Sequence, residues 1–101
     1  MSFAAVRSGE PIPIFNGKDY PYWKDKMKRH IMAINSAAWE VVKNGVTVKD
    51  KNAITPKEAK KMDLDAEVWV FITNHLIPEK YHEVKNISSA KGVWDYLEKI
   101  G

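Results

Sequence analysis

The stretch from residue 55 to residue 76, TPKEAKKMDLDAEVWVFITNHL, constrains the fold more than any other part of this chain. Thr55 suits an N-cap position, Pro56 suits the first helical position, and Glu58 follows three residues after the cap. In that spacing, the threonine hydroxyl and the glutamate carboxylate each accept a hydrogen bond from a backbone amide at the helix start. The sequence therefore predicts a helix from Pro56 to about Leu76, which stops before the next proline.

This predicted helix is apolar along two of its sides. At about 100° per residue, the first stripe contains Met62, Ala66, Trp69, Ile72 and Leu76. The second stripe contains Leu64, Val68 and Phe71, with Asp63, Glu67 and Asn74 between the two. A helix with two apolar sides packs against other elements on both sides. We therefore expect it to be the central helix of an all-α bundle.

The chain before residue 19 is expected to be an extended arm. The prolines at positions 11 and 13 disfavour helix in the residues before them, and the Asn-Gly pair at 16–17 is a turn signal. Asp19 is expected to cap a helix that begins near Tyr20, with Pro21 in its first turn. The apolar stripe of this helix contains Tyr20, Trp23, Met27, Ile31 and Ile34.

A second helix is predicted over residues 36–44, with Ser36 as its cap and with Trp39 and Val42 facing inward. The pair Asn44-Gly45 ends it. Residues 46–54 alternate only weakly, so we expect a basic loop there rather than a short strand.

Two helices are predicted after Pro78. Residues 78–84 form a short helix that presents Tyr81 and Val84. Ser88 or Ser89 then caps a last helix over residues 90–100, whose inner face carries Val93, Trp94, Leu97 and Ile100. The prediction is thus a bundle of about five helices: an arm at residues 1–18 and a single helical lobe at residues 19–101.

Residue patterns that carry chemistry are missing. The chain has no cysteine, which excludes disulfides and thiolate ligands. His30, His75 and His82 fit no zinc-motif spacing, and we expect His30 to be a partly buried, hydrogen-bonded side chain. Nucleophile-elbow, P-loop and dinucleotide-binding motifs are also absent. We therefore predict a protein that is not an enzyme and that has no catalytic residue, no metal, no cofactor and no small-molecule substrate.

The lengths of the apolar segments indicate the cellular location. No apolar run approaches the roughly 20 residues that cross a bilayer, and the first residues lack the apolar core of a signal peptide. We expect no membrane association and a cytoplasmic location.

Charge is unevenly distributed along the chain, whose net charge is +3. Residues 1–61 carry 12 Lys and Arg against 6 Asp and Glu, whereas residues 62–101 carry 4 against 7. A basic half of this kind could contact RNA phosphates or a protein partner, or its lysines could simply face water. The candidate contact residues are Lys24, Lys28, Arg29, Lys57, Lys60 and Lys61. The aromatic residues that might stack on bases lie mainly on inward stripes, which favours packing over RNA binding.

Two separated motifs resemble a known family. The segment IPIFNGKDYPYWKDKMKRHIMAINSAAWEVVKNG is similar to the start of the Gag polyprotein of plant copia-type LTR retrotransposons. The later segment ITPKEAKKMDLDAEVWVFITNHLIPEKYHEVKNISSAKGVWDYLEKIG is similar to the next stretch of the same family, in the same order and spacing. There a capped helix leads to a Pro-Glu turn, a short helix and a Ser-Ala-Lys-x-x-Trp-Asp-x-Leu motif. The first motif is matched by Phe15, Gly17, Tyr20, Trp23, Lys24, Met27, Ile31, Trp39, Val42 and Gly45, and the second by Ser89, Ala90, Lys91, Trp94, Asp95 and Leu97.

The resemblance implies the N-terminal lobe of a capsid-like fold, which assembles with further Gag copies into a particle around RNA. The family continues into a second lobe and often into a zinc knuckle that binds RNA, neither of which this sequence contains. The resemblance therefore implies that RNA is contacted mainly through that later region rather than through this lobe. Gly92 stands where the family often has a charged helix former. We interpret the aromatic motif residues, together with Trp69 of the predicted central helix, as structural.

Two alternatives remain open. One is a host-domesticated Gag module that binds a host protein, with a groove beside Pro11, Ile12, Pro13 and Ile14; the other is an RNA-binding domain that uses the basic face.

Overall fold

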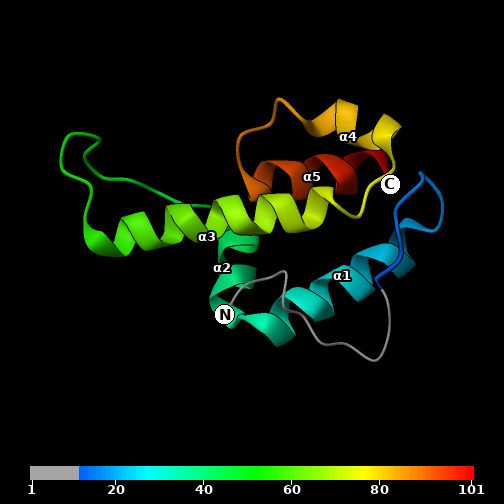
Figure 1. Cartoon of the computed structure of the whole chain (residues 1–101), viewed down its shortest axis with the longest axis horizontal. Coiled ribbons are helices and arrows are strands. Elements are labelled where there is room, and N and C mark those ends of the chain that lie inside the picture. Colours follow the sequence, from blue (N-terminus) through cyan, green and yellow to red (C-terminus); the bar gives the residue numbers. More distant parts are fainter. Residues whose placement is uncertain (1–11) are drawn as a thin grey trace.

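A computed structural model describes residues 12–101. Over this range the chain forms five α-helices and no β-strand: α1 (Tyr20–Ile34), α2 (Ser36–Asn44), α3 (Pro56–Thr73), α4 (Pro78–Val84) and α5 (Ala90–Ile100). In the view of Figure 1, α3 runs across the molecule, with α4 and α5 above it and α1 and α2 below it, and α5 also packs against α2. The predicted all-α bundle of five helices is confirmed, and residues 46–54 form a loop as expected.

The starts of α1 and α2 differ in detail from the prediction. Asp19 precedes α1, but its side chain makes no capping bond because its backbone is left-handed, with φ 52°. A capping side chain usually extends from a residue with extended backbone instead. Asn35 has that geometry, and its Oδ1 accepts a hydrogen bond from the Ala37 amide at 2.9 Å. Asn35 is therefore the cap of α2, and Ser36 is already its first helical residue.

The start of α3 agrees with the sequence and its end does not. Thr55 Oγ1 accepts a bond from the Glu58 amide at 3.1 Å, and Glu58 Oε1 accepts one from the Thr55 amide at 2.9 Å. The helix ends at Thr73 rather than near Leu76. Leu76 instead pairs with Phe15 in an isolated parallel bridge, in which Phe15 N donates to His75 O at 2.8 Å and Ile77 N donates to Phe15 O at 3.1 Å.

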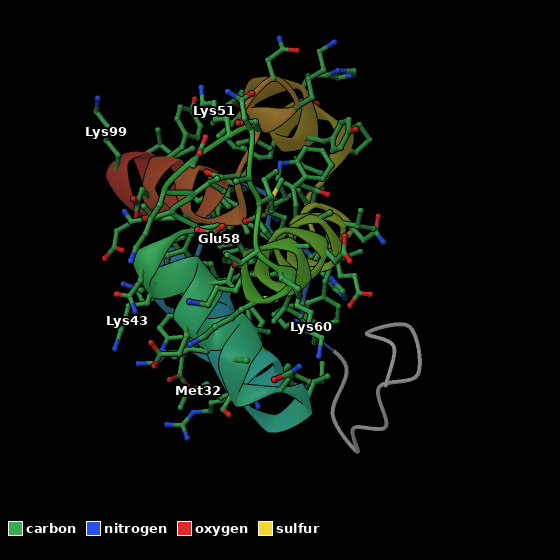
Figure 2. The ribbon with its side chains drawn as sticks, turned by 90° about the vertical axis from the view of Figure 1, so that its left-hand side faces the viewer. Met32, Lys43, Lys51, Glu58, Lys60 and Lys99 are labelled. Carbon is green, nitrogen blue, oxygen red and sulfur yellow. The ribbon has the colours of Figure 1, made fainter. Side chains whose placement is uncertain are left out.

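The first half of α3 projects beyond the other helices together with the loop that precedes it (Figure 1). Val68 and Ile72 are buried in the second half of the helix, but Met62 and Ala66 are exposed. The prediction that Met62 and Ala66 face inward was wrong, because the other helices pack against the opposite side of α3, where Val68 and Ile72 are buried. Seen from this end, Lys51, Glu58 and Lys60 lie toward the viewer (Figure 2).

The last helix is capped by Ser89, whose Oγ accepts a bond from the Gly92 amide at 2.9 Å. Val93, Trp94 and Leu97 are buried as predicted, but Ile100 is exposed. A Cβ at position 92 would lie only 2.6 Å from Cγ2 of Ile87 and 2.9 Å from the Ser89 hydroxyl. A side chain at position 92 would therefore force the side chains of Ile87 and Ser89 to shift.

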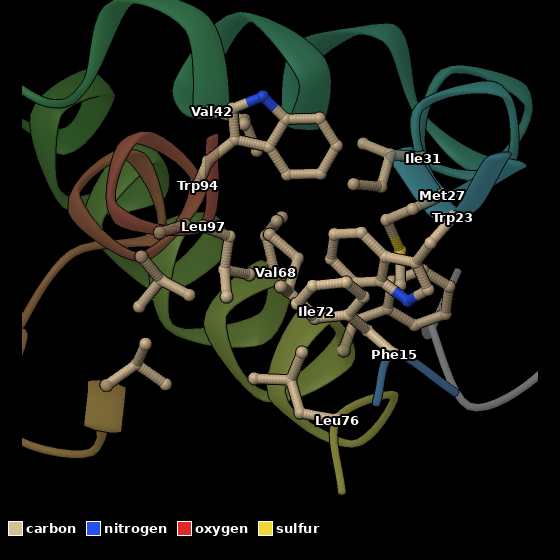
Figure 3. Packing of buried hydrophobic residues seen from close by; sticks show 14 of the residues in the cluster. Phe15, Trp23, Met27, Ile31, Val42, Val68, Ile72, Leu76, Trp94 and Leu97 are labelled. Carbon is tan, nitrogen blue, oxygen red and sulfur yellow. The ribbon is translucent and has the colours of Figure 1, made fainter. Parts of the chain in front are cut away.

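The core lies where α1, α2, α3 and α5 meet, and apolar side chains from all four fill it (Figure 3). Trp23 is 1% exposed, and its ring centroid is 5.4 Å from that of Phe15 and 5.8 Å from that of Trp94. Trp94 also meets Trp39 edge to face at 5.6 Å. α4 contributes Val84, whereas Tyr81 stays partly exposed with its ring against Trp69.

Part of the predicted arm can be placed. Residues 1–11, including Pro11, lie outside the described residues. Ile12 and Pro13 are half-buried, Ile14 is exposed, and Phe15 is buried in the core. Within residues 12–101, none of the helices combines the length and the apolar character needed to span a bilayer.

Candidate interaction surfaces

The candidate basic residues of α1 are engaged within the molecule. The Lys24 ammonium forms an ion pair with Glu98 of α5, and Arg29 Nε lies 3.0 Å from Asp25 Oδ2 on its own helix. Lys28 Nζ lies 5.1 Å from the centroid of the Trp39 ring, a cation–π contact with α2. Lys24 thus connects α1 to α5 and Lys28 connects α1 to α2, while Arg29 pairs within its own helix.

The candidate basic residues of α3 are differently placed. Lys57, Lys60 and Lys61 lie on its projecting half, at the opposite end of the molecule from the start of α1 (Figure 1). In the part of the chain that the structure describes, none of the three has an ion pair. The structure therefore does not bring the two predicted sets together into one surface.

Loop lysines join the α3 set instead. Lys49 and Lys51 belong to the loop before α3, and the Lys49 amide donates to Glu58 Oε2 at 3.1 Å, which holds the loop against the helix start. Lys51 and Lys60 lie on the same end of the molecule (Figure 2). We call this surface the basic end; it comprises Lys49, Lys51, Lys57, Lys60 and Lys61.

Glu58 is the acidic residue at the centre of this end. Backbone hydrogen bonds from Thr55 and then from Lys49 stabilise its carboxylate, and both lower its pKa below the ordinary value. Because both its oxygens accept backbone bonds, Glu58 acts as a structural clamp between loop and helix. Its negative charge also offsets part of the charge of the neighbouring lysines.

Most of the residues that match the two family motifs lie inside the molecule. Phe15, Tyr20, Trp23, Met27, Trp94 and Leu97 are buried. Trp39 and Trp69 are half-buried, and Trp69 Nε1 donates to Ile87 O at 2.8 Å. Gly17 has φ 97° in a turn, where a Cβ would lie 3.3 Å from Cε of Lys80. A left-handed turn of this kind favours glycine.

Two of the three histidines, His30 and His75, are half-buried and hydrogen-bonded, and His82 is exposed. His30 is half-buried with Nδ1 2.8 Å from Lys26 O, as expected, and His75 Nδ1 lies 2.8 Å from Phe71 O. Between residues 12 and 101, no group of three or more His, Asp and Glu side chains is arranged to hold a metal ion.

Sequence reasoning missed an apolar surface on α3. Four exposed residues, spaced three, four and four apart, form one line on its outward side. They are Ala59, Met62, Ala66 and Val70, and we call them the outer stripe. Val70 belonged to neither predicted stripe, which was a signal that a third side of the helix is apolar. Periodicity shows which residues share a side, but it does not show which side another helix covers.

We compared the chain with protein-family models, with curated proteins and with solved structures, and none of them matches it. The family resemblance therefore rests on the two motifs of the sequence.

Proposed function

We propose that this chain is a structural protein that works through contacts with further copies of itself, as the N-terminal capsid lobe of a copia-type Gag polyprotein. In this proposal it acts in the cytoplasm, where copies assemble into a particle around RNA. It carries out no reaction, and its working parts are surfaces rather than a catalytic site.

The contact between Trp23 and Trp94 carries this proposal. The two Gag-like motifs are 71 residues apart when measured between these two tryptophans. Their rings nevertheless pack at 5.8 Å in one core, to which Phe15, Met27 and Leu97 also belong. Two motifs that jointly build one lobe support a common origin for both resemblances. A lobe whose motif residues are used for packing acts through the side chains that remain outside.

Contacts between capsid lobes need not be strong individually. Each contact in a shell gains effective strength from the many others made at the same time. We therefore expect weak, reversible association of the isolated chain rather than a tight dimer.

Sedimentation velocity over concentrations from about 10 µM to about 1 mM tests the proposal. At weak-interface affinities, the average sedimentation coefficient rises with concentration across this range. Repeating the series at high salt separates apolar association from nonspecific charge attraction. A coefficient that stays at the monomer value up to the highest concentration at both salt levels contradicts self-association.

RNA binding by the basic end is a second candidate, because Lys57 and Lys61 have no ion pair within residues 12–101. Fluorescence anisotropy with a short single-stranded RNA tests it at low and high salt. Phosphate contacts predict an affinity that falls steeply with salt and with the double reversal Lys57→Glu and Lys61→Glu. Reversal of Lys24, which pairs with Glu98, should have a smaller effect. Salt-independent binding, or none, removes this candidate.

A further inference from the structure

The outer stripe is an apolar surface that the chain itself leaves uncovered. Met62 is 42% exposed and Val70 is 50% exposed, and the two alanines of the stripe are exposed as well. The stripe lies on the outward side of α3, opposite buried residues such as Val68 and Ile72, and the start of the helix also extends beyond α1, α2 and α5 (Figure 1). Alanines at every second turn allow another helix to approach closely, and the longer side chains provide apolar area to bury.

Charged side chains follow one edge of the outer stripe. Lys60, Asp63 and Glu67 lie on the same side of α3, and Lys60 and Glu67 are seven residues, or about 10 Å, apart along it. None of the three has an ion pair among the described residues, although charged side chains on the other four helices do pair. The edge is thus positive toward the helix start and negative farther on, and side chains of both charges are available for contacts with another molecule.

We propose that the outer stripe binds the same stripe of a second copy, with the two α3 helices antiparallel. A two-fold axis near residues 63–64 then places Met62 of each copy on Ala66 of the other. The same register brings Lys60 of each copy beside Glu67 of the other, so this contact occurs twice. It also places the two Asp63 side chains near the axis, where their like charges oppose part of the gain from the two Lys60–Glu67 pairs. This inference rests on the proposed function and specifies which surface the copies use.

Charge order selects both the partner and the direction. In an antiparallel pair, like edges of the two helices meet, and the lysine end of one edge therefore faces the carboxylate end of the other. A parallel pair would leave Lys60 and Glu67 without this match. A nucleic acid is disfavoured on the stripe itself, because Asp63 and Glu67 would repel phosphates and the apolar side chains offer them no donor.

The first experiment compares two methionines in the full chain by sedimentation velocity. Met62→Glu should weaken self-association by at least tenfold, because it buries a charge in each of the two Met62–Ala66 contacts of the dimer. Met32→Glu is the matched control: Met32 is 46% exposed on α1, outside the stripe, and the variant should associate like the parent chain. Circular dichroism melts of both variants check that each is folded.

The outcomes separate this inference from the proposed function. If the parent chain associates and Met62→Glu associates equally well, the stripe is not the contact and only this inference fails. If the parent chain stays monomeric at every concentration, both the stripe contact and the proposed function fail.

A charge-exchange cycle tests the register. Lys60→Glu and Glu67→Lys should each weaken association about tenfold, since each reversal creates two repulsive pairs in the dimer. The double variant should recover most of the loss. Lys61→Glu makes the same charge change about 100° farther round the helix and should have little effect. A double variant that is weaker than both single variants overturns the antiparallel pairing.

Discussion

A single hydroxyl stands out at the scale of residues. Tyr20 lies in the core, where its ring is 5.5 Å from that of Phe15, yet its hydroxyl is buried with no hydrogen-bond partner in the described structure. Burial, followed by the negative charges of Glu98 and Asp95, raises the pKa of this phenol above its ordinary value. The ring stabilises the fold, and the oxygen opposes part of that gain.

Tyr20→Phe should therefore raise the free energy of unfolding by about 1 kcal/mol at neutral pH, because it removes an unsatisfied buried group and keeps the ring. The parent chain should also lose stability above about pH 10, since the unfolded phenol releases its proton first, and the variant should lose less. Urea titrations at pH 8 and pH 11 measure both effects. Tyr22→Phe, at a site 58% exposed, should change little; a clear loss of stability in Tyr20→Phe would show that the hydroxyl has a partner.

At the scale of elements, the start of α3 is held to the preceding loop by one carboxylate. Glu58 receives backbone bonds from Thr55 and Lys49, and its lowered pKa records them. A carboxylate of this kind contributes stability above its unfolded pKa, and that contribution disappears as pH falls through the lowered folded value. Because this half of α3 projects from the bundle, we expect the loss to stay local.

Hydrogen exchange should show this directly. Lowering the pH from about 5 to about 3 should reduce the protection of amides in the first turns of α3 and at Lys49, while core amides of α5 stay protected. Glu58→Gln should remove most of this pH dependence, because glutamine does not titrate and still fits a capping box. Equal losses of protection in α3 and α5 would mean that acid acts on the whole fold instead.

Local sequence signals predicted where the helices lie better than they predicted which other segments each helix contacts. The capping box at Thr55 and the stripe of α1 depend on neighbouring residues alone, and the structure confirms both. The end of α3 depends on Phe15, a residue distant in sequence, which draws Leu76 into a bridge. The outer stripe depends on which side of α3 the neighbouring helices cover, and the position of the Lys24 side chain depends on Glu98 across the bundle. Those features need the three-dimensional arrangement and could not be found from periodicity.

One aromatic contact holds several elements together at the scale of the whole molecule. Trp94 of α5 packs on Trp23 of α1 and Trp39 of α2, and it is 4% exposed. Ring pairs at these distances add to the stabilisation that comes from apolar burial. Three of the five helices therefore depend on one side chain.

Trp94→Ala should lower the free energy of unfolding by about 3–5 kcal/mol through the cavity it leaves. Since domains of this size are stable by only about 5–15 kcal/mol, the variant should unfold at much lower urea concentration when followed by circular dichroism. Ile14→Ala, at a site 59% exposed, is the control and should stay within about 0.5 kcal/mol of the parent chain. A shift no larger than that of the control would mean that the core tolerates the missing ring.

The bridge between Phe15 and Leu76 has a consequence for synthesis. Trp23 Nε1 also donates to His75 O, across 52 residues of sequence. The N-terminal part of the lobe can therefore complete its packing only after the turn at residues 74–77 has been synthesised. A ribosome that has released only α1 and α2 has produced two helices whose aromatic faces lack their cover. Until that turn leaves the ribosome, the exposed aromatic faces of α1 and α2 are open to nonspecific association with other proteins. A chaperone that recognises exposed aromatics should therefore bind chains truncated before residue 75 more strongly than the complete chain.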